Sequence, residues 1–279
     1  MKLICSLLFL STILILINGC DTSGTQIGSS TRVRIELSGS STVGPLAAEI
    51  AKRYEEIEPR VQVNVQTGGS SRGIADARNG LADIGMSSRA LKDSEKEGRK
   101  SWPIAMDGVC FIIHASNTVS ELSREDLLAI MQGEKKNWKE LGGKDEPIVF
   151  INRAAGRSEL ELVTKYFDVK ADQIVADLIA GENQQGIKNV AGVENSISYM
   201  SVGASEDAIA RGTQIRMLPM NGINASVATV ESGEFPLSRP LILVTNDNPS
   251  EPVKSFIQFA QSADVSDLVR ELSYVPIPE

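Results

Sequence analysis

Three short segments of the sequence place glycine and hydroxylated residues at the start of a predicted helix. They are LSGSSTVGPL (37–46), TGGSSRGI (67–74) and FINRAAGRSELELV (150–163), and each contains or follows residues typical of a strand. The first turn of a helix has unpaired N–H groups and a partial positive charge, so it attracts anions, and nearby hydroxyls add donors. A single such turn is most often an ordinary helix cap. Three of them, with a fourth hydroxyl-and-arginine segment DIGMSSRAL (83–91), predict a shared site for an oxyanion.

Enzyme chemistry has little support in the same sequence. The single histidine, His114, ends an apolar run and is interpreted as structural, so a Ser/His/acid triad has only this one residue to use. There is no Gly-Lys-Thr phosphate loop and no metal-ligand cluster. The carboxylates are scattered along helix faces. The sequence therefore predicts binding without reaction, and no metal or cofactor.

The N-terminus indicates export and lipid attachment. Lys2 precedes an apolar run that ends at Cys20, which is the pattern of a signal peptide over residues 1–19. A membrane-spanning anchor is the alternative, but the run is shorter than the roughly 20 residues needed to cross a bilayer. We expect Cys20 to be the lipidated first residue of the mature protein, with the Ser, Thr and Gly-rich residues 20–31 as a flexible tether.

The amino-acid composition limits the classes of molecule that the protein can bind. The formal charge is −8, no basic run is present and aromatic residues make up 5% of the chain, so nucleic acid is an unsuitable partner. After export and lipidation the body has one remaining cysteine, Cys110, which lies in the apolar run GVCFIIH and is interpreted as a small buried hydrophobe. An internal disulfide is thereby excluded. The length of the mature chain suits one large core or two smaller ones.

Short apolar runs alternate with segments of helical period. Val33, Ile35 and Leu37 alternate with polar residues as in a strand, and residues 46–57 place apolar side chains on one helical face. Continuous apolar runs suit a sheet covered by helices on both faces, so the predicted class is α/β. The further strands expected are 61–65, 83–86, 109–114, 148–152, 196–200, 214–218 and 241–245.

Helix starts are well marked. Ser123 followed by two acidic residues predicts an N-cap, and Gly133 predicts the end of that helix. Pro45 is expected at the first position of the first helix.

The order of these motifs closely resembles the phosphate-binding lipoproteins that supply Pst-type ABC importers. The resemblance runs from about residue 32 to the C-terminus and rests on SGSSTVGPLAAEIAKRY, GGSSRGI, ADIGMSSRAL, DGVCFIIH, LSREDLLAIMQGEKKNWKELGG, INRAAGRSE and SISYMSVG. Each motif is weak alone, whereas their combination and order are specific. Trp138, in the Gly-x-x-x-Asn-Trp ending of one motif, is interpreted as a core residue.

The resemblance implies the two-lobed fold of type II periplasmic binding proteins, with the ligand in a cleft between the lobes. Two crossover strands act as the hinge, and they correspond here to 109–116 and 240–246. The first lobe is then expected to combine residues 32–114 with 242–279, and the second to span 115–241. Such an interface is also where small-ligand sites are commonly found, and lobe closure is a hinge motion.

The same resemblance assigns the phosphate site to residues of the four segments. The assigned residues are Ser41, Thr42, Val43 through its N–H group, Ser70, Ser71, Ser88, Arg89, Arg153, Arg157 and Ser158. In the family, the arginine at the position of Arg153 forms an ion pair with phosphate.

Two departures from the family pattern concern the proton that phosphate carries near neutral pH. One branch of the family has an aspartate acceptor where this chain has Ser88 followed by Arg89. The family often reads Arg-x-x-Gly-Ser-Gly-Thr, whereas this chain ends the same motif in Glu159. The candidate acceptors are therefore Asp107 and Glu159, and Asp107 is alternatively a residue that holds Arg153 or Arg89.

The prediction is a monomeric, lipid-anchored solute-binding protein on the outer side of the cytoplasmic membrane or in the periplasm. It captures inorganic phosphate and delivers it to a membrane-embedded ABC permease. The alternatives are a binding protein for another tetrahedral oxyanion, such as sulfate, arsenate, molybdate or tungstate, and a surface lipoprotein that acts as an adhesin or receptor. A phosphatase-like enzyme is the least supported.

Overall fold

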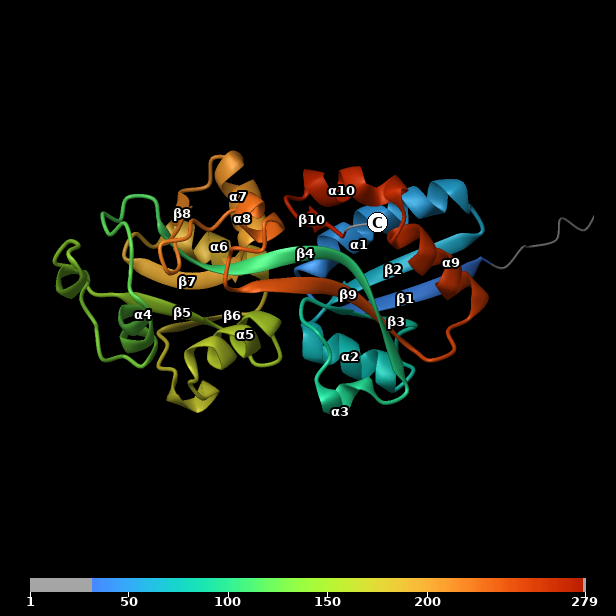
Figure 1. Cartoon of the computed structure of the whole chain (residues 1–279), viewed down its shortest axis with the longest axis horizontal. Coiled ribbons are helices and arrows are strands. Elements are labelled where there is room, and N and C mark those ends of the chain that lie inside the picture. Colours follow the sequence, from blue (N-terminus) through green and yellow to red (C-terminus); the bar gives the residue numbers. More distant parts are fainter. Residues whose placement is uncertain (1–31, 278–279) are drawn as a thin grey trace, which may run out of the picture. The chain divides into compact units, whose positions relative to one another are not determined.

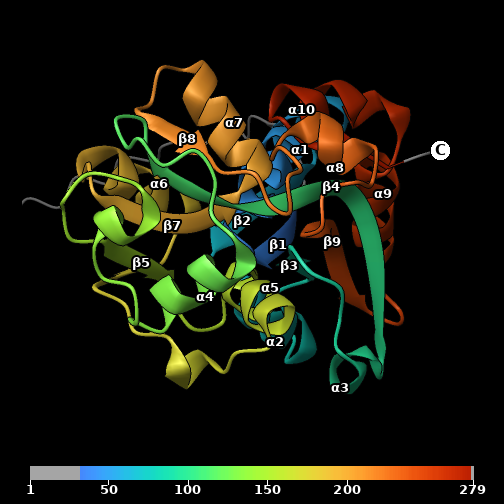
Figure 2. The ribbon, with the colours of Figure 1, turned by 60° about the vertical axis from the view of Figure 1, so that its left-hand side comes forward.

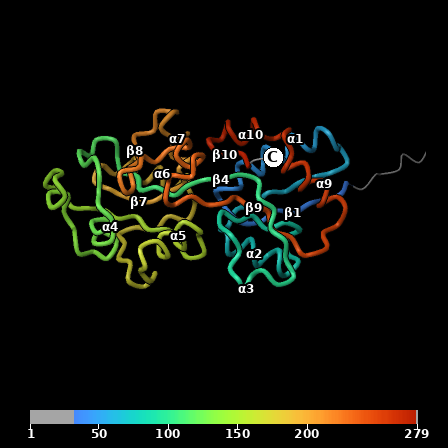
Figure 3. The backbone as a smooth tube through the Cα atoms, viewed as in Figure 1, coloured from blue at the N-terminus to red at the C-terminus, as the bar shows by residue number. Residues whose placement is uncertain are grey.

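Two strands, β4 (Arg99–His114) and β9 (Ser238–Asn246), cross between the two lobes of the fold (Figure 1). The structure is a computed structural model that describes residues 32–277, so the predicted signal peptide, Cys20 and the tether lie outside the described residues. β9 pairs with β4 from Arg99 to Gly108, and β7 (Ser196–Ser201) pairs with β4 from Val109 onward. The long strand therefore passes from one lobe to the other at Gly108 and Val109. The backbone trace shows β4 running through both lobes (Figure 3).

The first lobe is built on the strand order β2-β1-β3-β9-β4, with β10 added to β4. Its apolar core lies between this sheet and the helices α1, α9 and α10, while α2 covers the opposite face through Ile74. Its other elements are β1 (Val33–Gly39), α1 (Val43–Ile57), β2 (Val61–Thr67), α2 (Ser70–Arg78), β3 (Ile84–Ser87), α3 (Asp93–Lys96), α9 (Glu251–Ala260), the 3₁₀ helix η3 (Ala263–Val265), α10 (Ser266–Glu271) and β10 (Val275–Pro276).

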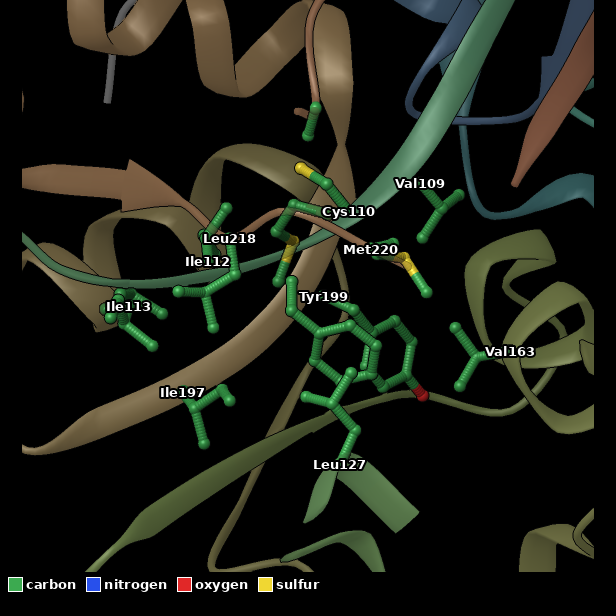
Figure 4. Packing of buried hydrophobic residues seen from close by; sticks show 14 of the residues in the cluster. Val109, Cys110, Ile112, Ile113, Leu127, Val163, Ile197, Tyr199, Leu218 and Met220 are labelled. Carbon is green, nitrogen blue, oxygen red and sulfur yellow. The ribbon is translucent and has the colours of Figure 1, made fainter. Parts of the chain in front are cut away.

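The second lobe continues the sheet in the order β4-β7-β5-β6, with β8 also paired to β4. Its core surrounds Tyr199 and the C-terminal half of β4 (Figure 4). Its other elements are α4 (Arg124–Met131), η1 (Trp138–Leu141), β5 (Val149–Arg153), α5 (Ser158–Phe167), η2 (Ala171–Gln173), β6 (Leu178–Ala180), α6 (Asn183–Gly192), β7 (Ser196–Ser201), α7 (Val202–Ala210), β8 (Ile215–Met217) and α8 (Val227–Glu231).

The predicted α/β class is confirmed, and so are the expected strands, with small shifts at their ends in every strand except β4. β4 is longer than predicted because it begins ten residues earlier, at Arg99, and runs through Pro103. Its register with β9 shifts between Pro103 and Ala105, which fits the bend of β4 in Figure 2. Pro45 is the third residue of α1, because the helix begins at Val43, so its prediction at the first position was wrong.

Several single-residue predictions are also confirmed. The Ser123 side chain accepts a hydrogen bond from the Asp126 N–H group and caps α4. Cys110 is a free, fully buried thiol, and burial raises its pKa. Trp138 is buried and donates its indole N–H to the Asn195 carbonyl oxygen. His114 is buried and bonds to the Ser116 hydroxyl. Within residues 32–277, no helix is both long and apolar enough to cross a membrane.

Candidate functional site

A buried group of polar side chains joins the two lobes at the point where β4 and β9 pass between them. The Ser88 hydroxyl of the first lobe lies 2.5 Å from the Ser158 hydroxyl of the second. All members are less than 9% exposed, and we call them the central polar cluster. The central polar cluster consists of Ser40, Thr42, Ser70, Ser88, Asp107, Arg153, Ser158, Glu159, Asn183 and Arg239.

Helix starts bring two of the serines into the central polar cluster. Ser70 is the first residue of α2 and Ser158 is the first residue of α5. The turns before them contain Gly69 and Gly156, whose φ angles of 101° and 81° are unfavourable for other residues. The Ser70 Oγ accepts the Ser88 N–H at 3.1 Å. Both helices therefore direct their positive N-terminal ends toward one place.

Close packing fixes α2 at this distance from the sheet. A Cβ atom added to Gly73 would lie 2.4 Å from the Ser38 carbonyl oxygen and 2.6 Å from the Cα of Gly39. Only glycine fits between α2 and β1 here. The sequence segment TGGSSRGI thus has a structural reason for its last glycine as well as for its serines.

In the first hydroxyl-rich turn, Ser40 and Thr42 have different roles. Ser40, and not Ser41 or Thr42, caps α1, because its Oγ accepts the N–H groups of Thr42 and Val43 at 3.1 and 3.3 Å. The Thr42 hydroxyl makes no cap bond. It donates to Glu159 Oε1 at 2.9 Å and lies 2.9 Å from Asn183 Nδ2, so it links the two lobes.

Arg239 is the central cation of the cluster. It lies on β9 directly opposite Asp107 of β4 in the antiparallel register. Its Nε and Nη2 donate to Asp107 Oδ2 at 3.2 and 2.9 Å, its Nη2 to Glu159 Oε1 at 3.0 Å, and its Nη1 to Ser158 Oγ at 2.9 Å. Burial alone would lower the pKa of Arg239, but Glu159 and Asp107 raise it, so this guanidinium stays charged.

Arg153 is the second buried cation. It ends β5, and its Nη1 donates to the carbonyl oxygens of Ala180 and Glu182 at 3.3 and 2.9 Å. Its Nη2 lies 3.6 Å from Glu159 Oε2, which is an ion pair without a hydrogen bond. Among residues 32–277, Nε and Nη2 of Arg153 have no hydrogen-bond partner. Buried guanidinium groups are normally satisfied, so these two donors are available to a ligand.

Glu159 places a carboxylate among these cations. It is the second residue of α5 and is 2% exposed. Burial alone would raise its pKa, but Arg239 and Arg153 outweigh burial and lower the pKa to about 2. Glu159 is therefore ionised at neutral pH. With Asp107 it balances the two arginines, so the buried cluster contains two positive and two negative groups.

The structure brings together Thr42, Ser70, Ser88, Arg153 and Ser158 of the predicted ligand residues, with both candidate acceptors. Asp107 binds Arg239, so the expectation that it holds Arg153 or Arg89 was wrong.

The remaining predicted residues lie outside the cluster. Arg89 bonds to Glu95 and Glu161, and Arg157 to Glu182. The Ser71 hydroxyl donates to Glu161 at 2.8 Å. Ser41 is half-buried and lines a surface pocket, and the Val43 N–H group is taken by Ser40, as described above.

Sequence reasoning missed Arg239 and Asn183. Arg239 interrupts the apolar β9 segment LSRPLILV, and a cation within such a run is a usable signal of a buried partner. Asn183 begins α6, after a glycine-containing turn like those of the predicted segments.

Two surface pockets adjoin the cluster. One, of about 350 Å³, is lined by Ser41, Thr67 and Asn183. The other, of about 490 Å³, is lined by Arg239, Lys92 and Lys165. Within the described residues, no group of three or more His, Cys, Asp and Glu side chains is arranged to hold a metal ion. The arrangement is a buried group of hydroxyl and guanidinium donors, and it suits an oxyanion.

Comparison with known proteins agrees with this geometry. Residues 23–264 match the family model of the PBP superfamily domain. The chain is 31% identical to the phosphate-binding protein PstS of Borreliella burgdorferi, over 87% of this chain and 90% of that protein. It is 26% identical to PstS of Bacillus subtilis, over 88% and 81%. A Clostridium perfringens protein described as a phosphate ABC transporter substrate-binding protein, solved with bound phosphate, is 31% identical with a TM-score of 0.82, over 88% of this chain and all of that one.

Proposed function

The chain belongs to the PBP superfamily and, within it, to the family of PstS phosphate-binding proteins, and we propose that it binds inorganic phosphate in the central polar cluster. The observation that carries this proposal is the Arg153 guanidinium, which is 1% exposed and keeps two N–H-bearing nitrogens without a partner among residues 32–277. A buried cation with free donors gains most from an anionic ligand.

The proposed contacts come from both lobes. Phosphate accepts hydrogen bonds from Arg153 Nε and Nη2, from Arg239, and from the hydroxyls of Ser70 and Ser158 at the starts of α2 and α5. The helix N-termini add a favourable field for the same anion. Asn183 borders both the cluster and the pocket of about 350 Å³, so we place the route from solvent there.

This set of donors is sufficient for tight binding. A hydrogen bond to a charged group contributes roughly 1.5–3 kcal/mol. Micromolar affinity requires only about 8 kcal/mol in total. Five or six such bonds therefore sum to about 8–18 kcal/mol, and over most of this range they leave a margin for the cost of removing water from the anion.

Binding is coupled to lobe closure in this proposal. The lobes meet through Ser88 and Ser158, through Thr42 and Glu159, and through Ser71, whose N–H donates to the Gly156 carbonyl oxygen at 3.2 Å. The crossing strands β4 and β9 serve as the hinge, at the point where β4 passes from its pairing with β9 to its pairing with β7. An anion that bonds to both lobes favours the closed arrangement.

We place the protein outside the cytoplasmic membrane, attached through lipid on Cys20 after removal of residues 1–19. It works as a monomer and passes phosphate to an ABC permease without reacting with it. The support for this placement is the signal and cysteine pattern of the sequence and membership of the family.

Titration calorimetry on the protein without its lipid tests the proposal. Wild type should bind phosphate at micromolar concentration or below. Arg153→Met should bind at least about 100-fold more weakly, because two charge-assisted hydrogen bonds are lost. The control Arg211→Met removes an exposed arginine of the second lobe that pairs with Asp207 and should bind like wild type. Absence of phosphate binding by wild type at millimolar concentration refutes the proposal, and tighter binding of sulfate redirects it to another oxyanion.

A further inference from the structure

Glu159 is unusual for a residue at the centre of an anion site, because it is itself an anion. Its Oε1 accepts hydrogen bonds from Thr42 Oγ1 at 2.9 Å and from Arg239 Nη2 at 3.0 Å. Its Oε2 faces Arg153 Nη2 at 3.6 Å. The carboxylate thus uses the same cations that we assign to the phosphate, and it is 2% exposed.

From this arrangement we infer that Glu159 takes up one proton whenever an oxyanion binds, so that the affinity for anions depends on pH through this residue. The inference rests on the proposed function and concerns the same site. It assigns Glu159 as the residue that sets which charge state of the ligand the site accepts.

The charge count is the first step of the argument. Arg153 and Arg239 are balanced by Asp107 and Glu159, and all four side chains are 3% exposed or less. A dianion that enters this cluster leaves two negative charges in excess. Uncompensated buried charge is very unfavourable, and a group in that position changes its protonation state instead. One proton that enters with the anion removes half of the excess.

The choice between the two carboxylates is the second step. Both carboxylate oxygens of Asp107 already have hydrogen-bond donors. Its Oδ2 accepts two N–H groups of Arg239, and its Oδ1 accepts the Gly203 N–H at 3.1 Å. Glu159 has the longer contact of 3.6 Å at Oε2, on the side of the free Arg153 donors. A proton on Oε2 can be donated to an anion oxygen, so Glu159 is the group that protonates.

Leaving the site is not an easy alternative for Glu159. Its backbone is fixed in the first turn of α5, and its side chain is bonded to groups on α1 and β9. The charged or titratable groups around it are cations on two strands, a carboxylate behind Arg239 and two buried tyrosines. These groups are Arg153 of β5, Arg239 of β9, Asp107 of β4, Tyr199 of β7 and Tyr274 before β10.

The direction of the pH effect follows from linkage. In the free protein the Glu159 pKa is about 2, and the negative charge of a bound anion raises it. Between the free and bound values the protein takes up a proton on binding, and the affinity falls by up to about tenfold for each pH unit of increase. Sulfate is the best probe, because it stays a dianion over the whole range in which phosphate titrates. Its pH dependence reports the protein alone.

The experiment is titration calorimetry of sulfate and phosphate at three pH values, about 5.5, 6.5 and 7.5, each in two buffers of different ionisation enthalpy, which counts the protons taken up. Wild type should take up about one proton per sulfate and bind it more weakly as the pH rises. Glu159→Gln removes the negative charge, so it should bind sulfate at least about tenfold more tightly at the highest pH, with no proton uptake. The control Glu251→Gln changes an exposed first-turn glutamate of α9 and should behave like wild type.

The outcomes separate this inference from the proposed function. If wild type binds phosphate but takes up no proton with sulfate and its sulfate affinity is independent of pH, the inference is refuted and the proposed function stands. If neither wild type nor Glu159→Gln binds phosphate at millimolar concentration, the proposed function itself fails. Proton uptake by wild type alone decides the inference if the variant does not fold.

Discussion

Replacing Arg239 by methionine keeps most of the side-chain volume and removes the cation on which the central polar cluster depends. Arg239 is 1% exposed and bonds to Asp107, Glu159, Ser158 and Thr42, so the substitution affects both lobes at once. Glu159 keeps Arg153 as a neighbour at 3.6 Å. Asp107 keeps one backbone N–H, from Gly203, as its donor.

The expected loss of stability is large. Removal of one partner from a buried ion pair costs about 3–5 kcal/mol, because the other charge is left uncompensated. For a protein of this size, 1 kcal/mol corresponds to roughly 2–4 °C in Tm, so we expect a decrease of about 6–20 °C. Phosphate affinity should fall as well, since Arg239 is one of the proposed donors.

The assay is thermal and urea unfolding of wild type, Arg239→Met, Asp107→Asn and the double variant. Asp107→Asn in the Arg239→Met background removes the carboxylate charge that has lost its partner. It should recover about half of the lost stability or more. Arg211→Met, which removes an exposed ion pair at the C-terminal end of α7, should change stability by no more than about 0.5 kcal/mol. A loss below about 1 kcal/mol for Arg239→Met would show that the buried network does not stabilise the closed arrangement as we describe it.

Three further predictions concern the residues around the cluster. Acid should remove about 3 kcal/mol of stability as the pH falls from 4.5 toward 2, because Glu159 is protonated at 4.5 when unfolded but near 2 when folded, and Glu159→Gln should lack this part of the pH dependence of urea unfolding. Gly73→Ala should destabilise the protein by at least about 1–3 kcal/mol in the same assay, because its Cβ would lie 2.4 Å from the Ser38 carbonyl oxygen. Tyr274→Phe should cost about 1 kcal/mol, because the hydrogen bond from the tyrosine hydroxyl to the Thr42 carbonyl oxygen, 2.9 Å long, is lost while that oxygen stays buried. For these variants, stability equal to wild type contradicts the assigned contacts.

Much of the fold follows from local patterns in the sequence. Alternating valines in β2, the apolar face of α1 and the Ser123 cap are short-range signals, and each appears in the structure where it was expected. The early start of β4 was missed because Pro103 and three polar or charged residues at its beginning are unfavourable for a central strand. That part of the strand is held by its long pairing with β9, which a local pattern does not reveal.

The candidate site could be predicted only where a residue and its neighbours in sequence are sufficient. The hydroxyls of Ser70 and Ser158 are positioned by the helix starts on which they lie, and these starts can be recognised from the local sequence. Arg89 and Arg157 stand in equally suitable segments, yet their partners are carboxylates that lie elsewhere in the fold. Arg239 was missed for the opposite reason, because only the antiparallel register of β4 and β9 places it against Asp107.

A crystal structure of the protein grown with arsenate tests the central claim most directly, because arsenic in a tetrahedral oxyanion is located by its anomalous scattering. Our account predicts one arsenic peak inside the central polar cluster, with oxygens at hydrogen-bond distance, about 3 Å, from Arg153 Nε or Nη2 and from the Ser158 hydroxyl. A peak only on the surface, or a cluster with Arg153 Nε and Nη2 bonded to protein groups and no anion, would contradict it.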